Sequence, residues 1–132
     1  MIDLYIEYNN VPHDSIESKN IEDAFWFGLK ELMPRKRNLE VTIVVSKLKN
    51  DSAQAYQCSI DKGEHEIEIN NGMEYEDLIT AVWHELVHVR QFERDQFQNE
   101  DHIPYFKKPS EIEAYKLQEE LLEKWNAKTR MN

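Results

Sequence analysis

Two histidines and a glutamate near the middle of the chain have the types and the spacing of a metal centre. His84 and His88 are four residues apart, and on an α-helix this spacing places both imidazoles on one face. Two neutral imidazoles so arranged can occupy two corners of a tetrahedral Zn²⁺ site. Glu85 is rotated away from that face, so it is poorly placed as a ligand but close enough to take a proton from a metal-activated water. The His-Glu-x-x-His pattern predicts a zinc-dependent hydrolase, with a chance match as the alternative.

A third ligand has to come from another part of the chain, because a catalytic zinc ion usually has three protein ligands. The last predicted helix offers Glu111 and Glu113. Glu113 has a competing role, since Ser110 and Glu113 have the spacing of a helix capping box. The residues that share a helical face with Glu111 are Ala114, Tyr115 and Gln118. The small Ala114 would allow close approach of the two helices, so the pattern favours Glu111 and leaves Glu113 open.

The hydropathy pattern predicts an α+β domain in the order β-α-β-β-β-α-loop-α, with a small mixed or antiparallel sheet packed on helices. Period-two alternation predicts strands at residues 2–8, 39–46, 53–61 and 64–70. Helical periodicity predicts a helix up to about residue 32, a motif helix over about 73–98 and a last helix over about 109–128. The strand at 64–70 alternates glutamate with isoleucine, which is typical of exposed sheet edges. The motif helix has an apolar stripe of Ile79, Val82, Trp83, Leu86 and Val89.

Composition limits the classes of partner. The chain has 132 residues, of which 40% are hydrophobic and 32% charged, as expected for one globular domain over residues 1–132. The net charge of −10 argues against nucleic acid or an anionic membrane surface as the main partner. A single cysteine, no signal-peptide pattern and no apolar run of about 20 residues favour a cytoplasmic protein.

The segment His84–His88, followed by Glu111-Ile112-Glu113-Ala114-Tyr115, resembles the gluzincin zinc metallopeptidases. The resemblance implies a minimal zincin-like domain in which Glu111 is the third ligand and Ala114 a small packing residue. Tyr115 stands where that family usually has an Asp or Asn that orients a ligand histidine, a role that a tyrosine hydroxyl could serve. The continuation Val89-Arg90-Gln91 and the segment Glu111-Ile112-Glu113-Ala114-Tyr115 look more like small metallopeptidases of bacteria and their phages. The resemblance also implies that residues 64–70 form the edge strand beside the cleft.

The leading hypothesis is a zinc-dependent peptidase with one Zn²⁺ per chain. His84, His88 and Glu111 would hold the metal, and Glu85 would act as general base and return the proton to the leaving amine. An extended peptide or protein substrate would pair with the edge at residues 64–70.

Other roles stay open at this stage. Residues that could donate a hydrogen bond to the oxyanion are His102, Tyr105 and Tyr115. The alternative function is a non-catalytic, metal-stabilised interaction module, associated with a phage or a toxin, in which Glu85 is dispensable. A third hypothesis is a metal-free binding domain with His84 and His88 on its surface. The sequence predicts neither the cleavage specificity nor the oligomeric state.

Overall fold

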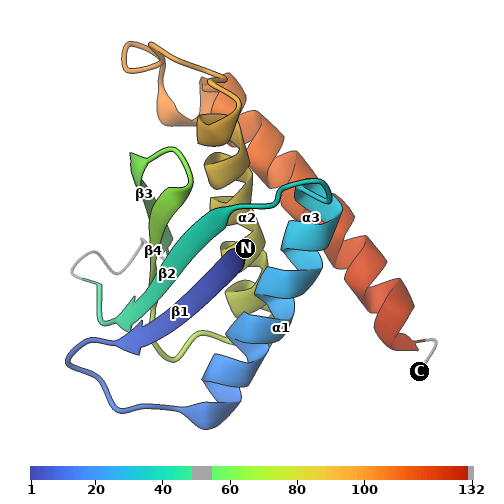
Figure 1. The fold of residues 1–132 in the computed structure, drawn as a ribbon. Helices are drawn as coiled ribbons and strands as arrows, with labels where there is room; N and C mark the ends of the chain where they lie inside the picture. The colour runs from blue at the N-terminus through green and yellow to red at the C-terminus, as the bar shows by residue number, and fades with distance from the viewer. Residues whose placement is uncertain (49–54, 131–132) are drawn as a thin grey trace.

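The computed structural model describes residues 1–48 and 55–130, with the backbone alone for residues 55–60. Over these residues the elements follow the predicted order, and the expectation of an α+β domain is confirmed (Figure 1). The elements are β1 (Ile2–Tyr8), α1 (Ser15–Leu32), β2 (Leu39–Ser46), β3 (Ala55–Asp61), β4 (Glu64–Asn70), α2 (Tyr75–Glu93), the 3₁₀ helix η1 (Tyr105–Lys107) and α3 (Pro109–Arg130). Residues 53–54 of the predicted third strand lie outside the described residues. No helix in the described part of the chain is long and apolar enough to cross a membrane.

The strands form one sheet in the order β1-β2-β4-β3. β1, β2 and β4 run parallel and β3 is antiparallel to β4, so the sheet is of the mixed type. The prediction that residues 64–70 form an edge strand is wrong, because β4 pairs with β2 on one side and with β3 on the other. Its alternation has another cause: Ile67 and Ile69 face the core, while Glu66 and Glu68, which alternate with them, face the other side of the sheet.

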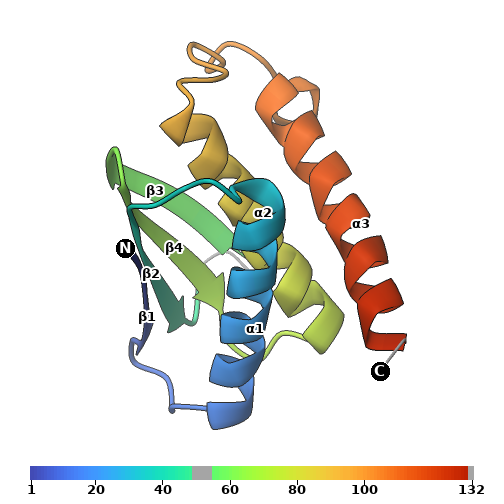
Figure 2. The ribbon, with the colours of Figure 1, turned by 45° about the vertical axis from the view of Figure 1, so that its right-hand side comes forward.

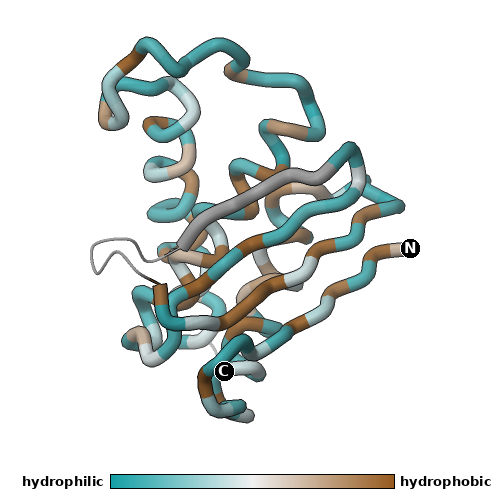
Figure 3. Tube along the Cα trace, turned by 90° about the vertical axis from the view of Figure 1, so that its left-hand side faces the viewer, coloured by the Kyte–Doolittle hydropathy of each residue, from teal (hydrophilic) through white to brown (hydrophobic). Residues whose placement is uncertain are grey.

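Helices cover one face of the sheet. Figure 2 shows α1 and α2 against that face, and α3 in a third layer on the far side of α2. Apolar and polar residues that alternate along β1 and β4 are visible in Figure 3. The predicted stripe of the motif helix is confirmed as core, since all five of its residues are buried. The sheet therefore anchors α2 from one side. The opposite side of α2 carries polar groups that face α3.

A glycine sets the distance between α1 and α2. Trp83 is fully buried and donates a hydrogen bond from its indole Nε1 to the carbonyl oxygen of Ala24 at 2.8 Å. A β-carbon on Gly28 would lie 2.6 Å from Cδ1 of Trp83, which is closer than two carbon atoms can approach. The absence of a side chain at position 28 thus lets the indole, next to His84 in the chain, pack against α1.

The motif helix is shorter than the sequence pattern suggests. It begins at Tyr75 and ends at Glu93, whereas periodicity predicted a helix up to residue 98. Asp95, Phe97 and Asn99 have φ angles of 54°, 58° and 65°, in the left-handed region, which is incompatible with a continuing right-handed helix. These residues form the loop that leads through η1 into α3.

A buried ionic network fixes the C-terminal end of α2. The carboxylate of Glu93 accepts hydrogen bonds from the Gly63 amide and the Lys36 ammonium, both at 2.6 Å, and lies 2.7 Å from Nε2 of His65. Burial by itself would raise the pKa of Glu93, but the hydrogen bonds from Gly63, Lys36 and His65 lower this pKa to about 2. Burial lowers the pKa of His65, against the opposing effect of Glu93. The network ties α2 to β4 and to the segment between α1 and β2.

Candidate metal centre

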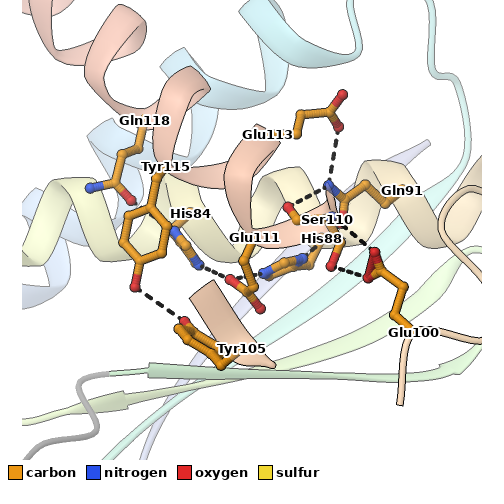
Figure 4. A network of polar contacts seen from close by, with 10 residues as sticks. All are labelled: His84, His88, Gln91, Glu100, Tyr105, Ser110, Glu111, Glu113, Tyr115 and Gln118. Atoms are coloured by element: carbon orange, nitrogen blue, oxygen red, sulfur yellow. Dashed lines mark hydrogen bonds and ion pairs between the residues drawn. The ribbon is translucent and has the colours of Figure 1, made fainter. Parts of the chain in front are cut away.

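The two histidines of α2 converge with a glutamate of α3. Nε2 of His84 lies 2.9 Å, and Nε2 of His88 3.1 Å, from the same oxygen, Oε1 of Glu111 (Figure 4). The two imidazole centroids are 5.0 Å apart, as expected for residues one helical turn from each other. One ligand atom from each of His84, His88 and Glu111 lies within 4.8 Å of the other two, so these residues form a group that could hold a metal ion.

Each histidine has an amide partner on its other ring nitrogen. Nδ1 of His84 lies 2.8 Å from Oε1 of Gln118, and Nδ1 of His88 lies 2.8 Å from Oε1 of Gln91. An amide oxygen only accepts hydrogen bonds, so each Nδ1 carries a proton and donates it. In a neutral imidazole the Nε2 atom then holds a lone pair.

The donor set fits a cation. Two Nε2 lone pairs and a carboxylate oxygen are three acceptors, and none of them carries a proton to share with the others when both rings are neutral. Ligand atoms about 3.3 Å apart are typical of a tetrahedral ion with bonds of about 2.05 Å, and the two histidine–Glu111 distances of 2.9 Å and 3.1 Å are close to this value. Without an ion, the two rings can form hydrogen bonds with Glu111 only if their Nε2 atoms are protonated. Although burial works in the opposite direction, hydrogen bonding to Glu111 and the charge of Glu85 raise the pKa of His88.

The pKa of Glu111 is shifted in the opposite direction to that of His88. Burial would raise the pKa of Glu111, but the hydrogen bonds that the protonated rings of His84 and His88 donate in the absence of an ion hold this pKa well below its usual range. The carboxylate is therefore ionised and ready to bind a cation. Glu111 is the glutamate that the sequence favoured, and it is the one placed between the two histidines.

Glu113 has a different role from the one predicted. Its Oε1 accepts a hydrogen bond from Nε2 of Gln91 at 3.1 Å, so it supports the partner of a histidine. The predicted capping box with Ser110 is absent, because both the amide and the hydroxyl of Ser110 bond to the carboxylate of Glu100. Glu100 lies in the loop before η1, and it provides the cap that sequence spacing had assigned to Glu113.

Glu85 is enclosed next to the ligand group. Its side chain comes from α2, and the residue is only 6% exposed. Burial raises the pKa of Glu85; the charges of His84 and His88 act in the opposite direction, and Glu111 acts with burial. Glu85 is thus a buried carboxylate whose pKa responds to the charges of all three candidate ligands.

The three predicted hydrogen-bond donors differ in how close they lie to the ligand group. The ring of Tyr115 packs edge-on against His84, with 4.6 Å between centroids, and its hydroxyl lies 3.1 Å from that of Tyr105. Burial, together with Tyr115 and Glu111, raises the pKa of Tyr105, so its hydroxyl keeps its proton. His102 is exposed, and among the described residues it makes no hydrogen bond or ion pair with the ligand group.

Two residues of the centre were not predicted as functional. Gln118 takes the histidine-orienting role that the resemblance suggested for Tyr115, and Gln91 takes the same role for the second histidine. A spacing signal exists for Gln91, because it follows His88 by three residues and so lies on the same face of the helix.

Comparison with known proteins gives no further assignment of the site. No protein-family model matches this chain, and no curated protein is similar enough to count as a relative.

Proposed function

We propose that this protein is a zinc-dependent peptidase with a minimal gluzincin-like domain. One observation carries the proposal: two Nε2 atoms with lone pairs and one carboxylate oxygen converge within 4.8 Å, beside a further buried carboxylate that is not part of the ligand group. A purely structural metal site has no use for that extra carboxylate, whereas hydrolysis needs a base.

His84, His88 and Glu111 would hold one Zn²⁺ per chain. When bound, zinc supplies Lewis acidity, which makes water more acidic and polarises a peptide carbonyl. Glu85 would accept the proton of the attacking water and later deliver it to the leaving amine. Its enclosed position supports this role, because a general base is most effective when its pKa lies nearer to neutrality than that of an exposed carboxyl group.

The pair of tyrosine hydroxyls supports a role in stabilising developing negative charge. Tyr105 from η1 and Tyr115 from α3 are joined at 3.1 Å, and Tyr105 also interacts with Glu111. A protonated hydroxyl beside the ligand group can donate a hydrogen bond to an oxyanion. We assign this function to Tyr105, with Tyr115 holding it in place, and not to His102.

The substrate would be an extended peptide bound along β3. This strand, in place of the predicted β4, is the edge of the sheet on the side of α2. A peptide that adds to a sheet edge forms main-chain hydrogen bonds without requiring a particular sequence. Such a peptide would run beside the helix that carries Glu85.

The test uses Glu85→Gln, with Glu76→Gln on an exposed position of α2 as the matched control. Glutamine has the size of glutamate but accepts no proton near neutral pH. We expect Glu85→Gln to bind zinc and to fold as the unchanged protein does, but to cleave a peptide library at least about 10²–10⁴-fold more slowly. The control variant should retain full activity.

Two outcomes would contradict the proposal. Cleavage by Glu85→Gln at the unchanged rate would remove Glu85 from the mechanism. Zinc binding with no cleavage by any of the three proteins would favour the metal-stabilised interaction module instead.

A further inference from the structure

We propose that Gln91 is a positioning residue that selects the tautomer of His88 and ties this ring to the turn that carries Glu111. The inference rests on the ligand group of the proposed function, but not on peptidase activity. Gln91 is 4% exposed and lies on α2 where α3 begins to pack against it.

The orientation of the Gln91 amide is set by its own donors. Its Nε2 group donates to the carbonyl oxygen of Ser110 at 3.0 Å and to Oε1 of Glu113 at 3.1 Å. Both partners are acceptors, so the NH₂ end of the amide has to face them. Its oxygen therefore faces Nδ1 of His88 at 2.8 Å.

This orientation determines where the ring proton resides. An amide oxygen opposite Nδ1 requires a proton on Nδ1, because two acceptors in contact in a buried site are unfavourable. The lone pair of neutral His88 is then on Nε2, which lies 3.1 Å from Oε1 of Glu111. Gln91 thus presents the nitrogen that a cation in the ligand group needs.

The same amide also holds the third ligand. Ser110, whose carbonyl oxygen accepts from Gln91, is the residue directly before Glu111. On its other side, the backbone N–H of Ser110 donates a hydrogen bond to Oε2 of Glu100 at 3.1 Å. The first turn of α3 is therefore fixed between Gln91 and Glu100, so that His88 and Glu111 are placed by one connected network (Figure 4).

Gln118 provides an internal comparison. It offers the same oxygen to His84, but its Nε2 has one long contact of 3.4 Å with the exposed Glu119. Nothing in that contact connects the ring of His84 to the turn before Glu111. The loss of Gln118 should therefore affect His84 alone, whereas the loss of Gln91 should affect His88 and the α3 turn together.

The test measures ring tautomers by long-range ¹H–¹⁵N correlation in the zinc-free, full-length protein, at a pH above the titration of the rings. In the unchanged protein we expect His88 to be protonated on Nδ1. In Gln91→Leu the His88 signals should shift towards the Nε2–H form while those of His84 stay unchanged, and Gln118→Leu should give the reverse. Zinc affinity, from competition with a chelator, should fall about 10–100-fold in Gln91→Leu, as is usual for partners of metal-bound histidines.

A rescue variant keeps the test valid if Gln91→Leu folds poorly. In Gln91→Glu one carboxylate oxygen still accepts from Nδ1 of His88, so the Nδ1–H tautomer should remain, but the other oxygen opposes the carbonyl oxygen of Ser110 and Oε1 of Glu113. The single variant should therefore lose zinc affinity, and adding Glu113→Gln, which restores a donor to one of these contacts, should recover part of it. An unchanged His88 tautomer in Gln91→Leu, or an unchanged zinc affinity in Gln91→Glu, would overturn the proposal. The expected tautomers without cleavage or zinc binding would refute the proposed function alone.

Discussion

Glu93 gives a prediction whose magnitude follows directly from the structure. In the unfolded chain its pKa should be close to the ordinary value of 4.5, and in the folded protein it is about 2. A difference of about 2.5 pKa units corresponds to roughly 3 kcal/mol, since one unit is worth about 1.4 kcal/mol. The carboxylate is 6% exposed, so solvent screening reduces this value little. Glu93→Gln should lower the free energy of unfolding at neutral pH by an amount of this order.

The pH dependence has a definite sign. Because the folded pKa of Glu93 is depressed, its stabilising effect is complete above about pH 4.5 and is lost as the pH falls towards about 2. The lowered pKa of His65 acts in the same direction, since below pH 6.5 the unfolded chain takes up the proton first. Both groups therefore make the folded protein less stable in acid.

Urea unfolding of the zinc-free protein between pH 7 and pH 2 measures the effect. The difference in unfolding free energy between the unchanged protein and Glu93→Gln should shrink from about 3 kcal/mol to near zero over the acid range. Glu120→Gln, on an exposed position of α3, should show no such convergence. A difference that stays constant with pH would refute the reasoning. It would show that Glu93→Gln destabilises the protein through lost packing or hydrogen bonds, and not through the loss of a carboxylate with a lowered pKa.

Three further substitutions test the metal centre and the packing behind it. Glu111→Ala should weaken zinc binding more than about 100-fold, as a direct ligand is lost, whereas Glu113→Ala, which removes an acceptor for Gln91, should stay within the range of about 10–100-fold that is typical of indirect partners. If chelator competition shows that Glu113→Ala alone releases the metal, the ligand assignment is wrong. Gly28→Ala should cost about 1–3 kcal/mol in urea unfolding, because a β-carbon would lie 2.6 Å from Cδ1 of Trp83. Unchanged stability would mean that the indole can move aside.

The sequence could predict the features that depend on residue spacing within a single helix or strand. The helical pattern of four residues places His84 and His88 on one face whatever the rest of the fold does. The apolar stripe of α2 and the alternation of β4 likewise follow from local periods of 3.6 and 2. These features are all present in the structure.

What the sequence could not predict depends on how elements meet. Alternating charge along β4 is compatible with an edge strand and with a central strand of a sheet covered on one face, and only the strand order decides between them. The role of Gln118 requires α3 to pack on α2 in one register, which no local pattern specifies. The end of α2 at Glu93 depends on positive φ angles at Asp95 and Phe97, and neither residue is a glycine that would mark such a break.

The metal centre joins two helices that are anchored to very different degrees. α2 lies between the sheet and α3, and its buried side chains cover most of its length. In α3, Ala114 and Leu121 are buried, and Leu117, Leu122 and Trp125 pack partly buried against the core, so its apolar contacts all follow the first turn. The polar contacts of Glu111 and Ser110 therefore hold the first turn, the part of α3 in which no apolar side chain is buried. Because Glu111 is ionised, a cation shared with the rings of His84 and His88 would strengthen the docking of this first turn, where α3 buries no apolar side chain.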